Sequence, residues 1–103
     1  MEITHEIFFS DGESVLVDGF DDLTFYNDLH STGQTATGYQ WQRNHEDLMN
    51  CLVDNKLFSL KRKNNIDELA YKEHTFAFNN GTLSENEPLI MTTNAVTTII
   101  KFP

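Results

Sequence analysis

The chain has 103 residues and a formal net charge of −9 at pH 7, with 39% hydrophobic and 12% aromatic residues. That apolar and aromatic content excludes an intrinsically disordered chain, and the length fits a single acidic domain spanning residues 1–103. The charge opposes binding to nucleic acid and to anionic membranes, because both are themselves negative. A lone cysteine, Cys51, excludes an internal disulfide and favours a reducing compartment.

The first residues show none of the features of a signal peptide. Met-Glu-Ile-Thr-His-Glu has no basic start and no uninterrupted apolar stretch. No apolar run in the chain approaches the roughly 20 residues that a membrane-spanning helix needs. We therefore expect a soluble protein located in the cytoplasm.

A β-hairpin is predicted at the N-terminus. Residues 3–9 and 14–17 are β-branched and aromatic, and Asp11-Gly12 between them favours a two-residue type I′ turn. This turn sets the expected pairing of the strands, which is Phe8 with Val15, Ile7 with Leu16 and Glu6 with Val17.

A short helix is predicted near residues 22–30, and a short strand after it. Asp21 or Asp22 would cap the helix, which presents Leu23, Tyr26 and Leu29 on one face. The Ser, Thr, Gly, Gln and Ala residues of 31–38 indicate a loop. Polar and aromatic residues alternate over 39–42, which predicts a strand.

The main helix is predicted over about 45–62. Asn44 is a suitable N-cap, and the basic residues 61–63 complement the negative end of the helix dipole. Its apolar residues recur at helical spacing, at Met49, Leu52, Val53, Leu57 and Leu60. The competing interpretation ends the helix near Asp54-Asn55 and makes 57–63 a strand.

The last third of the chain predicts β-structure. Residues 75–78 precede Asn80-Gly81, a strong hairpin turn signal, and residues 89–93 and 96–102 are rich in β-branched residues around a tight turn at Asn94-Ala95. The expected fold is therefore α+β, an antiparallel sheet of five or six strands with the main helix packed on one face. The residues expected in the core are Trp41, Leu52, Val53, Phe76, Phe78 and Ile99.

The sequence contains no recognisable catalytic or ligand-binding motif. The four histidines lack metal-ligand spacing, and the acidic turn at 18–22 fails the calcium-loop pattern. No glycine-rich phosphate loop or nucleophile elbow occurs. Cys51 on an apolar face is typical of a small buried side chain. We expect neither enzymatic activity nor a metal or cofactor.

The acidic residues are concentrated at the N-terminus. The first 42 residues contain eight Asp and Glu residues and no Lys or Arg, so this segment carries −8 of the net charge of −9. Mixed-sign surfaces are the commoner way to remain soluble, so we interpret the segment as a docking face for a basic protein surface. A solvated surface with no partner is the alternative. The candidate partner-binding residues are Glu13, Asp18, Asp21, Asp22 and Asp28.

In size, charge and lack of catalytic motifs, the chain resembles the small acidic inhibitors that bacterial viruses use against host restriction or CRISPR nucleases. The resemblance implies a non-enzymatic inhibitor, active in the host cytoplasm, that masks the nucleic-acid-binding surface of a nuclease. An immunity protein would work by the same physics. A second hypothesis is a structural protein, such as a virion component, whose run from Leu89 to Phe102 supplies an edge strand for homo-oligomers. A third is a small ligand-binding domain or enzyme with Tyr39 and Trp41 beside its pocket.

Overall fold

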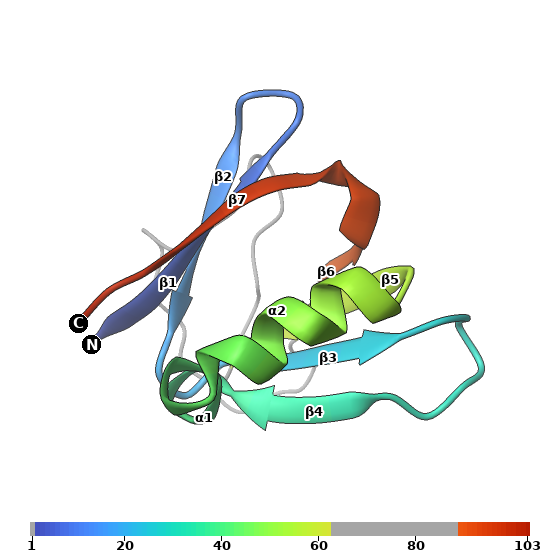
Figure 1. Cartoon of the computed structure of the whole chain (residues 1–103), viewed down its shortest axis with the longest axis horizontal. Coiled ribbons are helices and arrows are strands. Elements are labelled where there is room, and N and C mark those ends of the chain that lie inside the picture. The colour runs from blue at the N-terminus through green and yellow to red at the C-terminus, as the bar shows by residue number, and fades with distance from the viewer. Residues whose placement is uncertain (1, 63–88) are drawn as a thin grey trace, which may run out of the picture.

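The computed structural model describes residues 2–62 and 89–103, and Figure 1 shows how their elements are arranged. The fold is α+β, as predicted, with one main helix and one short helix. The described strands form two antiparallel sheets, with orders β2-β1-β7 and β4-β3-β5-β6, rather than the one sheet of five or six strands that we expected. In chain order the elements are β1 (Ile3–Phe9), β2 (Ser14–Asp18), β3 (Asp22–Tyr26), β4 (Gln34–Thr37), α1 (Gly38–Arg43), α2 (His45–Asp54), β5 (Leu57–Lys61), β6 (Leu89–Thr92), the 3-10 turn η2 (Thr93–Ala95) and β7 (Val96–Lys101).

The predicted N-terminal hairpin is present, but its register differs by one residue. Ile7 pairs with Val15 and Phe8 with Ser14. The turn contains three residues instead of two, because the Phe9 N–H donates to the Glu13 carbonyl at 2.9 Å and Gly12 adopts a φ of 90°. Such a loop, a turn followed by a left-handed glycine, is the next most common hairpin connection after the two-residue turn.

Residues 22–26 form strand β3, so the helix predicted near 22–30 is wrong. Leu23 and Phe25 are buried while Thr24 between them is half-buried, which is the two-residue period of a strand. The Thr24 hydroxyl lies 2.8 Å from the hydroxyl of Thr35 on β4. Leu29, expected on the apolar face, is exposed.

Residues 39–42 lie in helix α1, so the strand predicted there is also wrong. Thr37 caps the helix, because its hydroxyl accepts from the Gln40 N–H and the Gln40 side chain accepts from the Thr37 N–H. This Thr-x-x-Gln pattern is a capping box that can be read in the sequence. The helix brings Trp41 into the core, where the indole N–H donates to the Leu23 carbonyl at 3.3 Å.

The long helix predicted over 45–62 is wrong, and the competing interpretation of a strand over 57–63 is confirmed for Leu57–Lys61; Arg62 lies beyond the strand, and residue 63 lies outside the described residues. Helix α2 ends at Asp54, and Asn55 is fully extended with φ −121° and ψ 153°. Phe58 and Leu60 are then buried at alternate positions of β5, which pairs with β3 on one side and with β6 on the other. Pairing on both sides makes the strand more favourable than further turns of helix.

The two C-terminal strands were predicted correctly, but they belong to different sheets. β6 pairs with β5, and β7 pairs with β1. The turn between them is held at both ends: the Thr93 N–H donates to the Lys56 carbonyl, and the Ser10 N–H donates to the Ala95 carbonyl. The chain therefore crosses between sheets at η2. The strand expected at 75–78 and the turn at 80–81 lie outside the described residues.

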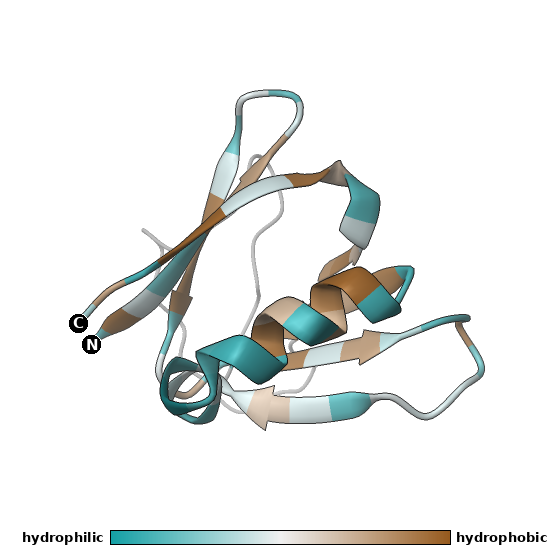
Figure 2. Cartoon of the chain, in the orientation of Figure 1, coloured by the Kyte–Doolittle hydropathy of each residue, from teal (hydrophilic) through white to brown (hydrophobic). Residues whose placement is uncertain are grey.

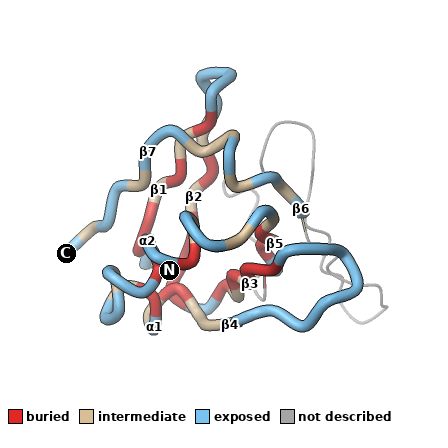
Figure 3. Tube along the Cα trace, turned by 45° about the vertical axis from the view of Figure 1, so that its right-hand side comes forward, coloured by how far each residue is buried: buried red, intermediate tan, exposed pale blue. Residues whose placement is uncertain are grey.

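The core lies where the two sheets and the helices meet, and Figure 3 shows its buried stretches concentrated in β1, β2, β3 and β5. Of the residues expected there, Trp41 is buried, whereas Leu52 and Ile99 are half-buried at its margin. Val53 was predicted wrongly, because 83% of its side chain is exposed. Phe76 and Phe78 lie outside the described residues. Helix α2 instead turns Leu48 and Cys51 inward.

Candidate functional site

The five predicted partner-binding acids lie in three separate parts of the fold. Glu13 is in the β1–β2 turn, Asp28 is in the β3–β4 loop, and the other three lie at or beside the β2–β3 connection, as Figure 1 allows the reader to follow. Glu13 and Asp28 are exposed, and Asp22 is half-buried in β3. Asp18 and Asp21 are only 1% and 0% exposed, so our assumption that they lie on the surface is wrong.

Asp18 and Asp21 form a buried ionic network with Arg62. One guanidinium nitrogen of Arg62 pairs with Asp21 Oδ2, and the other donates to the Leu16 carbonyl at 2.7 Å. Asp21 Oδ2 also accepts the Asp18 N–H at 2.9 Å, and Asp18 Oδ1 accepts the N–H groups of Phe20 and Asp21. Burial raises the pKa of Asp21 to about 7, although the Arg62 charge lowers it. These carboxylates are structural.

The same network positions helix α1 against the β2–β3 connection. The Gly38 N–H donates to the Asp21 carbonyl at 2.9 Å, and the Tyr39 N–H donates to the Gly19 carbonyl at 3.0 Å. A Cβ atom on Gly38 would collide with the Asp18 carbonyl oxygen, so only glycine fits at this position. Local sequence could not reveal the network, because Arg62 is 41 residues away from Asp21.

A groove between α2 and β7 is the strongest candidate for a binding surface. Its cavity of about 230 Å³ is lined by Met49, Leu52 and Val53 of α2 and by residues 96–99 of β7. Met49 is 39% exposed and Val53 is 83% exposed. Figure 2 shows apolar stretches interrupted by polar ones along both elements. We call this feature the α2–β7 groove; sequence analysis missed it because the wrong helix length assigned Val53 to the core.

The α2 side of the groove is acidic. Helix α2 contains Glu46, Asp47 and Asp54, all exposed, and no Lys or Arg. Glu46 lies three residues before Met49 and seven before Val53, so helical geometry places all three along one stripe. On the β7 side, residues 96–100 are uncharged and Lys101 follows them. The groove therefore has exposed apolar side chains, with three carboxylates on its α2 side and one lysine at the end of β7.

Two histidines stack where β1 meets the start of α2. His5 of β1 and His45 of α2 stack with ring centroids 6.4 Å apart. His5 is fully buried, and its Nδ1 lies 2.9 Å from the Thr4 hydroxyl. Burial, reinforced by the nearby His45 and Lys101, lowers the pKa of His5 to about 4. His5 is therefore neutral at pH 7 and acts as a packing residue.

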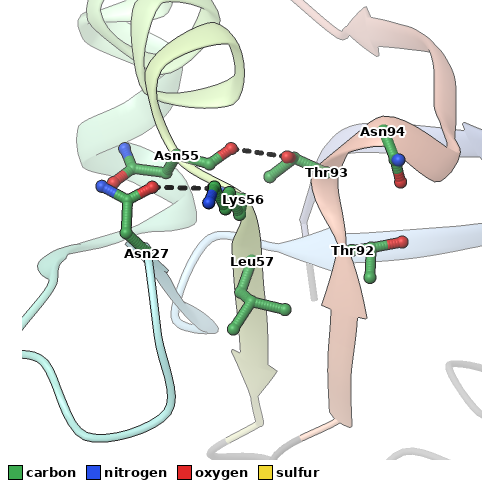
Figure 4. Close-up of a pocket in the computed structure, with 7 residues that line it drawn as sticks. All are labelled: Asn27, Asn55, Lys56, Leu57, Thr92, Thr93 and Asn94. Atoms are coloured by element: carbon green, nitrogen blue, oxygen red, sulfur yellow. Dashed lines mark hydrogen bonds between the residues drawn. The ribbon is translucent and has the colours of Figure 1, made fainter.

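A second cavity, of about 460 Å³, lies beside the α2–β5 connection and the end of β6. Its lining is Asn27, Asn55, Lys56, Leu57, Thr92, Thr93 and Asn94, drawn in Figure 4. Several of these groups hold the connections in place: Asn27 Oδ1 accepts the Lys56 N–H at 3.1 Å, and the Thr93 hydroxyl donates to the Asn55 carbonyl at 2.5 Å. The Asn27 amide oxygen and the Thr93 hydroxyl are therefore engaged in holding these connections.

Tyr39 and Trp41 do not line either of these two cavities. Trp41 is enclosed in the core, and the Tyr39 ring packs edge-on against Phe20 with centroids 5.3 Å apart. Our expectation of a small-molecule pocket beside these two aromatic residues is therefore not supported by their positions.

Cys51 is buried, as predicted, and its thiol donates to Gln34 Oε1 at 3.4 Å. Burial, and then the charges of Asp47 and Asp54, raise its pKa, which disfavours the reactive thiolate. Within residues 2–62 and 89–103, no group of three or more His, Cys, Asp or Glu side chains is placed to hold a metal ion.

In the same part of the chain, no helix has the length and apolar character needed to cross a membrane. Comparisons with protein-family models, with curated proteins and with solved structures found no match to this chain.

Proposed function

We propose that this protein is a non-enzymatic binding protein that covers a basic surface of a partner protein through the α2–β7 groove. The observation that carries the proposal is the exposure of Met49 and Val53 on a helix that has three carboxylates and no basic side chain. Protein interfaces combine an apolar centre with a polar rim, and complementary charge adds association rate and specificity. Helix α2 supplies both the exposed apolar side chains and the charged side chains.

The charge of the whole molecule supports a basic partner. The formal net charge of −9 would accelerate encounter with a positive surface and repel nucleic acid. Glu13 and Asp28 are exposed and contribute to this field, whereas Asp18 is buried and Asp21 is buried against Arg62. The most concrete form is an inhibitor of a host defence nuclease of the anti-CRISPR or anti-restriction type, or an immunity protein, because the surface masked would be one that binds nucleic acid.

A structural protein that assembles through its C-terminal strands is the alternative. β7 lies at the edge of its sheet, which is the feature that such an assembly would use. However, pairing two copies through β7 would bring two α2 helices, each with three carboxylates, to the same β7–β7 interface. Like-charge repulsion therefore favours a basic partner over a second copy.

The test compares two charge-reversal variants in capture experiments at low and high salt. The first variant is Glu46→Lys/Asp47→Lys/Asp54→Lys, and its control is Glu13→Lys/Asp28→Lys, which reverses exposed acids away from α2. We expect a basic nucleic-acid-binding protein to be retained by the wild type and by the control, to be lost with the α2 variant, and to elute as salt rises. Equal retention by both variants would rule out the α2–β7 groove.

A further inference from the structure

We infer that the partner binds by adding an extended, basic segment as a new strand along β7, with one apolar side chain in the α2–β7 groove. The inference rests on the proposed function, and it specifies how that function is performed. In strand addition the main chain supplies affinity, while pockets for alternate side chains supply specificity.

β7 is the most suitable of the described edge strands. It has six residues, whereas the other edges, β2, β4 and β6, have five, four and four. The Leu16 carbonyl of β2 already accepts a hydrogen bond from Arg62. No second described strand pairs with β7 beyond β1. Residues 96–100 also lack the charges that proteins use to block their sheet edges.

The register of β7 shows which backbone groups face outward. The Phe102 N–H donates to the Thr4 carbonyl at 2.9 Å, so hydrogen-bonded pairs with β1 recur at every second residue. Ile99 and Lys101 lie in the intervening positions, and their N–H and C=O groups point away from β1. These are the groups that an added strand would pair with.

The same register places one partner side chain in the groove. Ile99 pairs with the buried Ile7 and lines the cavity together with Met49, Leu52 and Val53. Residues directly opposite each other in a sheet have side chains on the same face. The partner residue opposite Ile99 therefore lies over this cavity, whose volume of about 230 Å³ suits one aliphatic side chain.

The carboxylates of α2 favour basic residues at other positions of the partner segment. The groove is bordered on α2 by Glu46, with Asp47 and Asp54 on the same helix, and β7 contributes no charge before Lys101. In an extended strand, basic residues two positions away from the apolar residue lie on its face, so such a segment would direct them toward α2 and these carboxylates. A second copy of this chain would supply the uncharged run 96–100 and three further carboxylates instead.

The test uses a synthetic peptide with a central Val, Lys two positions before and after it, and Thr at the positions between, so that Val and Lys share one face of the strand. The intact protein is observed by amide NMR and hydrogen exchange. We expect a salt-sensitive complex in which the Ile99 and Lys101 amides gain protection. Alternate amides of an extended peptide point to opposite edges of the strand. N-methylation of the amides that face β7 should weaken binding at least tenfold, whereas methylation of the amides that face solvent should leave binding nearly unchanged. The matched control replaces every Lys with Glu, and we expect that peptide not to bind.

Three results would overturn the inference. One is equal binding of the two N-methylated peptides, which means docking without strand pairing. Another is no binding at about 1 mM peptide, the weak end of specific association. The last is sedimentation of the protein alone as a dimer that loses its association on Ile99→Pro, which means that a second copy occupies the edge. In the first two cases, a partner that the wild type retains and the α2 charge-reversal variant loses would still support the proposed function.

Discussion

Arg62 is the residue on which the β2–β3 connection depends. It is 1% exposed, pairs with Asp21 and donates to the Leu16 carbonyl, so a single side chain ties the end of β5 to two segments near the N-terminus. Removing one partner of a buried pair leaves an uncompensated charge, which costs more than the net value of the pair.

We therefore predict that Arg62→Met destabilises the protein by about 3–5 kcal/mol. Adding Asp21→Asn to this variant should restore part of the loss, because the double variant buries one charge fewer. Urea unfolding measures both, and Glu13→Gln is the exposed control, expected to change stability by less than about 0.5 kcal/mol. A near-native midpoint for Arg62→Met would mean that the ion pair is not buried in solution.

His5 makes stability depend on pH. Its pKa falls from 6.5 in the unfolded chain to about 4 in the folded protein, so the unfolded state binds more protons between these values. The contribution of neutral His5 to the free energy of unfolding is fully present above pH 6.5 and is lost as the pH falls towards 4. Asp21, whose pKa is raised to about 7, acts in the opposite direction and loses stability as the pH rises from about 4 to 7.

We predict that His5→Gln reduces the loss of stability between pH 6.5 and pH 4 by roughly 3 kcal/mol relative to the wild type. Because Asp21 is present in both proteins, its opposite contribution cancels in the comparison. His30→Gln, which changes an exposed histidine, is the control substitution. Parallel profiles for the wild type and His5→Gln in urea unfolding would show that His5 is not buried in a neutral form.

At the scale of elements, α2 has two apolar faces with different roles. Leu48 and Cys51 face the core, while Met49 and Val53 face the α2–β7 groove and solvent. Burial, rather than hydrophobicity, decides what each residue contributes to stability, because an exposed side chain loses little when it is truncated.

We predict that Leu48→Ala costs about 2–5 kcal/mol of unfolding free energy, whereas Val53→Ala costs less than about 0.5 kcal/mol. Both variants shorten an aliphatic side chain on the same helix, and Val53→Ala also gains helix propensity because Val is β-branched, which lowers its net cost further. Denaturant unfolding measures the two values. If Val53→Ala were as destabilising as Leu48→Ala, Val53 would belong to the core and could not serve a partner.

At the scale of the whole molecule, charge acts through the sum of its groups. The formal net charge is −9. Among residues 2–62 and 89–103, every acid except Asp18 and Asp21 is at least partly accessible. Non-specific affinity for nucleic acid comes from pairing phosphates with Lys and Arg, and exposed basic residues in the described chain are scattered at Arg43, Lys56, Lys61 and Lys101.

We predict no association with DNA or RNA near 0.15 M salt, because the electrostatic contribution that supplies non-specific affinity is reversed in sign. Fluorescence anisotropy with labelled single- and double-stranded oligonucleotides measures this directly. Micromolar binding at that salt concentration would contradict the prediction. It would also contradict the idea that this protein repels nucleic acid while covering a partner surface that binds nucleic acid.

The sequence by itself determined the features that depend on neighbouring residues. The Asp11-Gly12 hairpin, the start of α2 after Asn44, the β-branched C-terminal strands and the burial of Cys51 all follow from local turn, capping and strand preferences. The capping box at Thr37 and Gln40 was also readable locally and would have predicted α1.

Only the tertiary structure decided the rest. Residues 57–61 satisfy both a helical and a strand pattern, and pairing with β3 and β6 selects the strand. Asp18 and Asp21 look like surface acids until Arg62, 41 residues beyond Asp21, is brought against them. The α2–β7 groove joins segments more than 40 residues apart. Periodicity reports which residues share a face of one element, but only packing shows which face the neighbouring elements cover.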